Sequence, residues 1–332
     1  MKILLFLLAA IGLNLIATSR LNGQQKLAVP LQERMFQLNE IDLHVHSGKE
    51  RPMPLNEWVD FLVRDGKKVL LLLDHLELYR MEEKEKNEWL SKNKLTDWYP
   101  DLTNGKYQLM KDLTNISASR KDVLIFRGWE IWEGELDEGL EKQPMKEAEV
   151  IGWHFSKAAW NGKAPMGKEL ISRVKQIIEV QKEFPVPMIL FHPFAGHYNA
   201  VRDAVLQSGR QVTSIKKEEY RYFTSDEQQE LISLLKGNSI YMEIEMGWLA
   251  LWNDPIVREA FTEDIRPLVD AGLKFTVSTD AHNQSHLIKP YQPEVYCNAL
   301  GVTPENVNTI VRELQAIRAK KSLNTTVSLL SD

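Results

Sequence analysis

Short apolar runs that end in a histidine or a carboxylate recur along almost the whole of this 332-residue chain. Each run has the length of a β-strand, and segments with the period of an amphipathic helix lie between the runs. The runs cover residues 41–46, 70–75, 123–130, 151–154, 188–192 and 275–282. Alternating strands and helices are typical of a parallel sheet, whose strands all end at the same edge. The sequence therefore predicts that polar side chains from distant segments converge on one point.

The alternation predicts an α/β fold with seven strands. We expect the strands at residues 41–46, 69–74, 123–126, 150–154, 186–191, 240–245 and 273–278. Helices are predicted at 55–65, 168–184, 225–235, 255–268 and 304–319. Six of the seven strands carry a polar residue at the C-terminal end. This pattern favours a closed (β/α)7 barrel with its site at the C-terminal ends of the strands.

The first residues have the layout of a secretory signal peptide, which we place at 1–23. Lys2 precedes an apolar run, 3–17, that is short for a membrane span, and small and polar residues follow. An uncleaved anchor is the alternative. We therefore expect an exported protein, periplasmic or secreted, with no membrane span after removal of the signal peptide. Residues 38–320 would form a single domain, with 76–120 as an excursion over the site and 321–332 as a tail.

Charge and cysteine content narrow the possible partners and ligands. The formal net charge of −5 provides no general basic field, so no nucleic-acid partner is expected. Cys297 is the single cysteine, which excludes an intramolecular disulfide and a cysteine-based metal site. Any metal must therefore be held by imidazole and carboxylate. Nothing in the sequence indicates an oligomeric state.

Two histidine motifs have the spacing of metal ligands. His44 and His46 lie two residues apart on a predicted strand, so both side chains project from the same face and can bind one ion. Asp74 and His75 are adjacent and would face opposite ways on a regular strand, so we expect one of them to orient its neighbours. Oxygen and nitrogen ligands together suit zinc, manganese or iron. The sequence thus predicts a multi-metal hydrolytic centre.

The order of these motifs is specific. They read Asp42-x-His44-x-His46, Asp74-His75, Arg127-Gly-Trp-Glu130, Gly152-Trp-His154, His192-Pro193, Glu243-Ile-Glu245 and Ser278-Thr-Asp280-Ala-His282. The set resembles the polymerase and histidinol phosphatase (PHP) family of metal-dependent phosphoesterases, over about residues 40 to 285. The resemblance implies a distorted seven-stranded barrel of PHP type that holds two or three divalent ions.

The resemblance also implies the metal ligands. They are His44, His46, His75, Glu130, His154, His192, Asp280 and His282. By the family pattern, the first ion lies among the first-motif histidines, Glu130 and the last aspartate. Glu130 would bridge it to a second ion bound by His154 and His192, and His75 and His282 would belong to a third position.

Carboxylates around the ligands would orient them. The family pattern implies that Asp42 orients a histidine, that Asp74 supports the site and that Glu243 faces the pocket. In one respect this chain departs from the pattern. Many members continue the first motif with a further histidine for the third ion, whereas this chain continues with the sequence SGKERP. A ligand for the third ion is then missing, or is replaced by Glu50 or Glu77.

The implied reaction is hydrolysis by a metal-activated hydroxide. Divalent ions lower the pKa of a bound water from about 15.7 towards about 7 and offset charge on the phosphoryl oxygens. The sequence offers no Gly-x-Ser-x-Gly motif that would supply a nucleophile instead. We expect Glu130, Asp280 and His282 to be catalytic, with either Asp280 or His282 protonating the leaving group.

Candidate substrate contacts follow the motif strands. Lys49, Arg51, His197 and Arg202 are the candidate cations for a phosphate group, and solvated surface charge or a structural role is the alternative for each. Trp132 and Trp248 are candidates for an aromatic wall that stacks on the organic part of a substrate, with core packing as the alternative.

The combined prediction is an exported metal-dependent phosphoesterase that acts on a small organic phosphate mono- or diester. A barrel amidohydrolase that cleaves a C–N bond is a second hypothesis, because such enzymes also begin with His-x-His. A metal-stabilised binding domain without turnover is a third. Glu130 as a bridging carboxylate and the Asp280-x-His282 ending favour the phosphoesterase.

Overall fold

The structure is a computed structural model that describes residues 31, 34–94, 96–101, 103–155, 166–245, 253–288 and 292–331. Residues from Met35 onwards form one compact unit. The predicted signal peptide, 1–23, and the predicted substrate contact Trp248 lie outside the described residues. Among the helices that the structure describes, none is long and apolar enough to cross a membrane.

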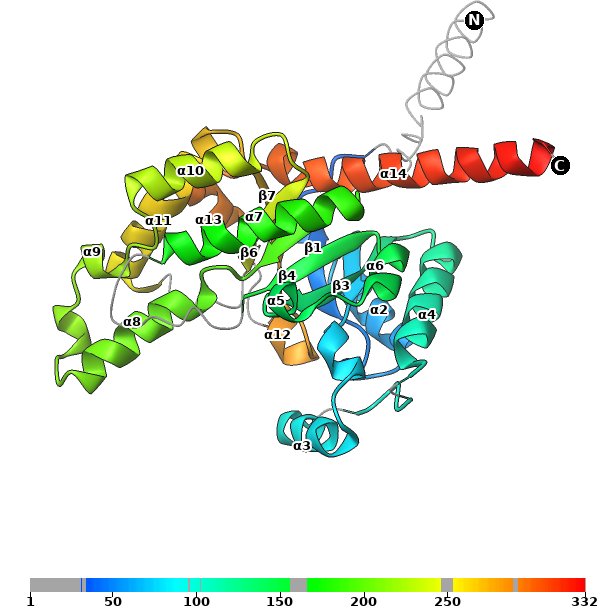
Figure 1. The fold of residues 1–332 in the computed structure, drawn as a ribbon, viewed down its shortest axis with the longest axis horizontal. Helices are drawn as coiled ribbons and strands as arrows, with labels where there is room; N and C mark the ends of the chain where they lie inside the picture. The colour runs from blue at the N-terminus through cyan, green and yellow to red at the C-terminus, as the bar shows by residue number, and fades with distance from the viewer. Residues whose placement is uncertain are drawn as a thin grey trace, which may run out of the picture. The chain divides into compact units, whose positions relative to one another are not determined.

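Seven parallel strands form the centre of this unit (Figure 1). They are β1 (Ile41–His46), β2 (Val69–Leu73), β3 (Leu124–Trp132), β4 (Val150–His154), β5 (Met188–Phe191), β6 (Ile240–Glu245) and β7 (Lys274–Ser278). Each strand pairs in parallel with the next one in the chain. The predicted number and order of strands are confirmed.

The sheet closes on itself just beyond the end of β7. The backbone N–H of His46 donates to the carbonyl of Ala281 at 3.1 Å, and Val45 and Ala281 form a parallel bridge. We call this contact between β1 and Ala281 the seam. It makes the sheet a nearly closed, distorted (β/α)7 barrel, as the sequence predicts.

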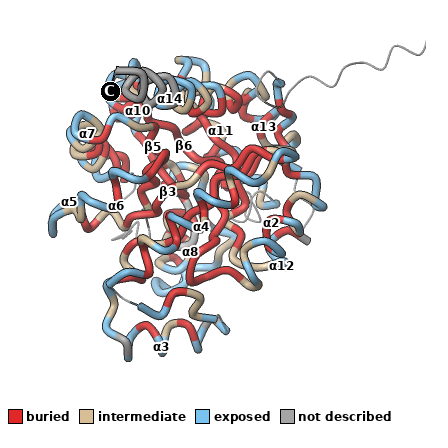
Figure 2. Tube along the Cα trace, turned by 90° about the vertical axis from the view of Figure 1, so that its right-hand side faces the viewer, coloured by how far each residue is buried: buried red, intermediate tan, exposed pale blue. Residues whose placement is uncertain are grey.

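Helices surround the barrel (Figure 1). The longer ones are α2 (Leu55–Arg64), α3 (Glu83–Asn93), α4 (Gly105–Ser119), α7 (Gly167–Glu183), α8 (Ala195–Gln207), α10 (Ser225–Leu235), α11 (Pro255–Asp270), α13 (Pro293–Leu300) and α14 (Pro304–Ser331). Shorter elements are η2 (Leu38–Glu40), η3 (Leu76–Tyr79), α5 (Glu135–Glu138), α6 (Lys142–Glu147), η4 (Val212–Ser214), α9 (Lys217–Tyr220) and α12 (Gln284–Ile288). Figure 2 shows buried residues gathered on the strands and exposed ones along the outer helices.

Two segments differ in detail from the sequence-based prediction. The predicted excursion, 76–120, contains η3 and α3 and then returns to the barrel through α4 before β3. The last helix continues to Ser331, so the segment assigned to a tail, 321–332, is helical up to that residue.

A glycine in β4 makes room for an aromatic ring that supports the first histidine of the site. A Cβ atom at Gly152 would lie 1.7 Å from a ring carbon of Phe191. The Phe191 ring stacks on the His44 ring, with 3.8 Å between the ring centroids. Packing at the strand ends therefore fixes the plane of the His44 imidazole before any ligand binds.

We predict that Gly152→Ala destabilises the fold by about 1–3 kcal/mol, because the added methyl group displaces Phe191. Urea unfolding of the single variants and of Gly152→Ala combined with Phe191→Leu measures the effect. The smaller side chain should relieve the clash, so the double variant should lose less stability than the sum of the two single variants. Strictly additive losses would contradict this interpretation.

Candidate metal centre

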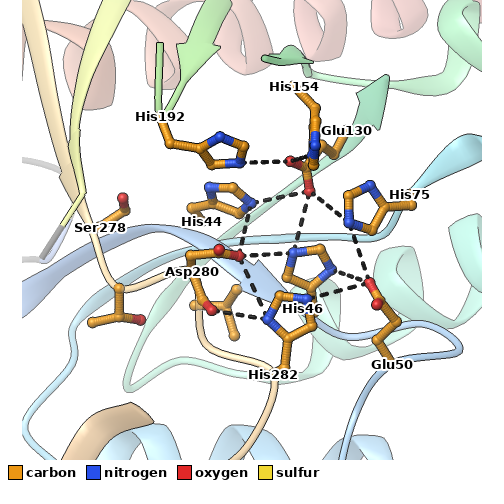
Figure 3. A network of polar contacts seen from close by, with 12 residues as sticks. His44, His46, Glu50, His75, Glu130, His154, His192, Ser278, Asp280 and His282 are labelled. Carbon is orange, nitrogen blue, oxygen red and sulfur yellow. Dashed lines mark hydrogen bonds and ion pairs between the residues drawn. The ribbon is translucent and has the colours of Figure 1, made fainter. Parts of the chain in front are cut away.

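Nine histidine and acidic side chains from six segments meet at the C-terminal ends of the strands (Figure 3). They are His44, His46, Glu50, His75, Glu130, His154, His192, Asp280 and His282. All eight residues that the sequence predicts as metal ligands are in this cluster. Glu50, which the sequence analysis offered as a replacement for a missing ligand, is the ninth.

Glu130 lies at the centre of the cluster, and its two oxygens face different sets of imidazoles. Oε1 lies 2.8 Å from His154 Nδ1 and 3.3 Å from His192 Nε2. Oε2 lies 3.1 Å from His44 Nε2 and 3.2 Å from His46 Nε2. The carboxylate is fully buried. This is the geometry of a carboxylate that bridges two neighbouring cation positions.

Asp280 completes the set around the two histidines of β1. Its Oδ1 lies 3.0 Å from His46 Nε2 and 3.3 Å from His44 Nε2. The backbone of Asp280 has φ 52°, in the left-handed region that a non-glycine residue rarely adopts. His192, another candidate ligand, has φ 33°. Strained residues of this kind concentrate at functional sites, where surrounding contacts hold them.

Glu50 lies beside His75 and His282, where the sequence offered Glu50 or Glu77 as the replacement ligand for a third ion. Its Oε2 lies 2.8 Å from His46 Nδ1, and it lies 3.5 Å from the Nε2 atoms of both His75 and His282. Glu77, the other candidate, lies to the side, 3.2 Å from His75 Nδ1. The structure therefore places Glu50 in the cluster and Glu77 at its edge.

The cluster fits divalent cations. Four groups within it bring three or more ligand atoms within 4.8 Å of one another. No N–H or O–H of the described chain is aligned for a hydrogen bond to either oxygen of the buried Glu50. Its close contacts are with the imidazoles of His46, His75 and His282, and a cation held between the carboxylate and these rings would offset the cost of burying the charge. The mixture of nitrogen and oxygen ligands suits zinc, manganese or iron.

The electrostatics of the cluster also favour a bound cation. Burial disfavours a charged imidazole, yet the carboxylates of Glu130, Glu243 and Asp280 raise the pKa of His44 well above its usual value. Burial likewise opposes ionisation of Glu130, but His75 and His44, with the other imidazoles, hold its pKa well below the usual range. The carboxylates that draw protons onto these imidazoles would attract a metal ion in the same way.

Glu243 fixes the orientation of two candidate ligands. Its Oε1 accepts a hydrogen bond from His44 Nδ1 at 2.8 Å and another from the hydroxyl of Ser278. Its Oε2 accepts one from the backbone N–H of His192 at 2.5 Å. A proton on Nδ1 leaves Nε2 of His44 free to face Glu130. Glu243 thus faces the site, as predicted.

Asp42 has a different contact from the one expected. The family resemblance implied that it orients a histidine side chain. Its carboxylate instead accepts hydrogen bonds from the Thr279 backbone N–H at 3.0 Å and the Thr279 hydroxyl at 2.6 Å. It also accepts one from the His44 backbone N–H at 3.4 Å. Asp42 therefore holds the residue that precedes Asp280, and supports that ligand through the backbone.

Asp74 supports the loop that follows β1, while its neighbour His75 points to the cluster. Asp74 Oδ2 accepts hydrogen bonds from the Lys49 backbone N–H at 2.6 Å and from the Tyr79 hydroxyl at 2.7 Å. A Cβ atom at Gly48 would lie 2.1 Å from the same oxygen, so the loop approaches Asp74 only because residue 48 has no side chain. The two neighbours thus face different surroundings, and the role of His75 as a metal ligand stays a prediction.

Two of the predicted substrate cations are buried and bound within the protein. Lys49 is fully buried, and its ammonium group lies 2.8 Å from Asp97 Oδ1. Arg51 is 6% exposed and donates from Nη1 to the carbonyl of Ser47 at 3.0 Å. The expectation that these side chains bind substrate phosphate is therefore corrected, because contacts with residues distant in sequence turn both inwards.

The other predicted cations lie on α8, away from the centre. His197 is fully buried, and its Nε2 bonds to the carbonyl of Tyr220 at 2.9 Å. Burial lowers the pKa of His197 to about 4, so the ring is neutral near pH 7 and cannot serve as a phosphate cation. Arg202 is partly exposed and forms no ion pair with the carboxylates that the structure describes. Neither residue contacts the cluster.

Of the two tryptophans predicted to contact a substrate, the structure describes Trp132. Trp132 ends β3 and is partly exposed, but its ring lies over Gly134, where a Cβ atom would come within 2.4 Å of it. The ring therefore packs on its own loop.

A cavity that the sequence did not reveal opens beside the cluster. It is small, about 20 Å³, and its wall includes Phe155 and Pro193, which directly follow His154 and His192. Arg173 of α7 also lines it and pairs with Asp137 at 2.7 Å. Within its predicted helix Arg173 resembled any other residue of the polar face. Only the packing of α7 beside the strand ends places it here.

Comparison with known proteins gives a likeness of fold. No family model and no curated protein matches the sequence. A histidinol phosphate phosphatase from Lactococcus lactis subsp. lactis Il1403, complexed with zinc, L-histidinol and phosphate, has a TM-score of 0.46 at 13% identity, over 80% of this chain and 95% of that one. A Xaa-Pro dipeptidase with bound methionine has a TM-score of 0.37 at 13% identity, over 84% and 75%. Adenine deaminase from Arthrobacter aurescens has a TM-score of 0.38 at 11% sequence identity, over 82% of this chain and 91% of that one. No conclusion about activity follows from likenesses at this level.

We predict that His197 makes the fold sensitive to acid. Its pKa falls from 6.5 in the unfolded chain to about 4 in the folded one, so the unfolded chain binds more protons between these values. The stability that the neutral ring contributes is present above pH 6.5 and is lost as the pH falls towards 4. Between pH 7 and pH 5 the loss should be about 2 kcal/mol.

Urea unfolding of the wild type and of His197→Gln at pH 7 and pH 5 measures how much stability the titration of His197 costs. Glutamine keeps an N–H for the Tyr220 carbonyl and does not titrate, so the variant should lose about 2 kcal/mol less than the wild type on acidification. An identical pH dependence in both proteins would show that His197 does not contribute.

Proposed function

We propose that this chain is an exported metal-dependent phosphoesterase that hydrolyses a small organic phosphate mono- or diester with two or three zinc, manganese or iron ions. The observation that carries the proposal is the position of Glu130. One oxygen faces His154 and His192, and the other faces His44 and His46, all within 3.3 Å. Export is proposed from the composition of residues 1–23.

Divalent ions in this cluster would activate a water molecule as nucleophile and offset the charge that develops on the phosphoryl oxygens. The chain's own residues hold and orient the ligands. Glu130 and the two histidines of β1 are at most 1% exposed, so water reaches them only from the open side of the cluster. Asp280 and His282 form part of that open side, each with a side chain that is 22% exposed.

Asp280 and His282 are therefore placed to meet an incoming substrate. His282 Nδ1 bonds to the backbone carbonyl of Asp280 at 2.9 Å, which keeps the proton on Nδ1. This contact fixes the ring beside the carboxylate at the open side of the cluster. A proton would reach the leaving alkoxide through one of these two side chains, as the sequence suggests. Neither the attack by water nor the protonation of the leaving group needs a nucleophilic side chain.

The organic part of the substrate would occupy the cavity beside His154 and His192. The hollow there has a volume of only about 20 Å³, room for about one water molecule, so most of a substrate would lie towards solvent. Arg173 is a further candidate cation at this wall, which it shares with the carboxylates of Glu133 and Glu169. Trp248, which the structure does not describe, stays a proposed contact from sequence.

Two features support a phosphoesterase over the alternatives. The group at the centre is the carboxylate of Glu130, whose oxygens lie within 3.3 Å of four imidazoles. Barrel amidohydrolases bridge their metals with a modified lysine or with a carboxylate and end with a lone aspartate, whereas this chain ends with Asp280-x-His282. The open side formed by Asp280 and His282 supports turnover over a purely structural metal site.

We predict that Glu130→Gln lowers the turnover of chromogenic phosphate mono- and diesters by more than about 100-fold, because it removes the central ligand. The assay uses purified protein with added manganese or zinc. Glu138→Gln, an exposed substitution on α5, is the matched control and should retain full activity. Equal rates in wild type and Glu130→Gln would contradict the proposal. Cleavage of chromogenic amides without cleavage of phosphate esters would favour the amidohydrolase.

A further inference from the structure

The loop that carries Glu50 is bound to a segment far away in the sequence. Residues 47–53 follow β1, and residues 97–99 lie between α3 and α4. We call these two stretches the Glu50 loop and the 97–99 segment. The residues on both sides of Glu50, Lys49 and Arg51, contact the 97–99 segment and almost no solvent.

Lys49 makes the first connection. Its ammonium group donates to Asp97 Oδ1 at 2.8 Å and to the carbonyl of Tyr99. The other oxygen of Asp97 lies 2.8 Å from the ammonium group of Lys86, on α3. Asp97 thus balances two lysines that are at most 3% exposed. Removing one partner of a buried ion pair leaves an uncompensated charge, so this contact is costly to break.

Arg51 makes the second connection. Its guanidinium group donates to the Tyr99 hydroxyl at 3.1 Å and lies 4.5 Å from the centre of the Trp98 ring. The indole N–H of Trp98 donates back to the carbonyl of Arg51 at 2.9 Å. The Tyr99 hydroxyl in turn donates to Asp112 Oδ2, on α4, at 2.9 Å. The Glu50 loop is therefore held on both sides of Glu50.

Glu50 itself faces a distinct part of the cluster. The Nε2 of His46 faces Glu130 and Asp280, whereas its Nδ1 lies 2.8 Å from Glu50. A neutral imidazole offers one lone pair, so an ion bound at Nε2 leaves the proton on Nδ1. The ligands left for an ion beside Glu50 are then His75 and His282, whose Nε2 atoms both lie 3.5 Å from its carboxylate.

We propose that the 97–99 segment positions Glu50 so that it completes the third cation position with His75 and His282, and that contacts about fifty residues away in sequence set the occupancy of this position alone. The proposal rests on the metal centre of the proposed function and not on its substrate. Asp97, Trp98 and Tyr99 are positioning residues, because they touch the Glu50 loop and not the cluster.

The test measures zinc binding by the full-length chain without substrate. Zinc is titrated in a competing chelator buffer, and the bound metal is counted by elemental analysis. Glu50→Gln should bind one zinc ion fewer than the wild type. Asp97→Asn should reach the wild-type number, but its last ion should bind more than about 10-fold more weakly, as expected when a supporting contact is lost. Its other ions should bind as in the wild type.

Asp101→Asn is the matched control. Asp101 is exposed and bonds to Thr103 and Asn104 of its own turn, so the same substitution there should leave zinc binding unchanged. A wild-type number of ions with wild-type affinities in Glu50→Gln would overturn the site. Equal affinity for the last ion in Asp97→Asn and Asp101→Asn would overturn the role of the 97–99 segment. Zinc binding as expected, without phosphate ester cleavage, would contradict only the proposed function.

Hydrogen exchange of the wild type keeps the proposal testable if a variant does not fold. The backbone N–H of Lys49 bonds to Asp74, so it reports on the Glu50 loop. Protection of residues 47–53 and of 97–99 should rise together as the last zinc ion binds. Protection that rises only with the first ions, or in one stretch alone, would overturn the coupling.

Discussion

The buried carboxylate of Glu130 is the interaction on which the arrangement of the site depends. It lies on β3, the longest strand, whose first half pairs with β2 and whose second half pairs with β4. The strand therefore brings one side chain to the middle of the barrel mouth. Out of contact with water, that carboxylate requires polar partners, and the imidazoles of His44, His154 and His192 lie within 3.3 Å of it. The position of Glu130 on β3 and the negative charge of its carboxylate together create a site that could hold cations.

The convergence of the candidate ligands could be predicted from the sequence because it depends on the strand pattern. Apolar runs of strand length end at His46, His154 and Glu130, and parallel strands end at one rim. The residues just beyond the strands could not be predicted in the same way. Lys49 and Arg51 follow His46 closely, and the sequence gives no sign that residues 97–99 turn both inwards. His197 likewise became a core residue through the packing of α8 and α9.

The contacts that support the candidate ligands were also predictable only in part. The sequence predicted that carboxylates would orient the ligands, and Glu243 does so for His44. The target of Asp42 was different, because the seam brings the end of β7 beside β1 and presents Thr279 to its carboxylate. Pattern and spacing identify which residues approach the rim. The hydrogen-bond partner of each residue is decided by how the barrel closes.

The position of the seam has a kinetic consequence. The residue that joins the last strand to the first is Ala281, which lies between Asp280 and His282. Separating the two edges of the sheet would withdraw both side chains from the mouth at once. A cation held by these residues would then lose two candidate ligands in one step, and not one after the other.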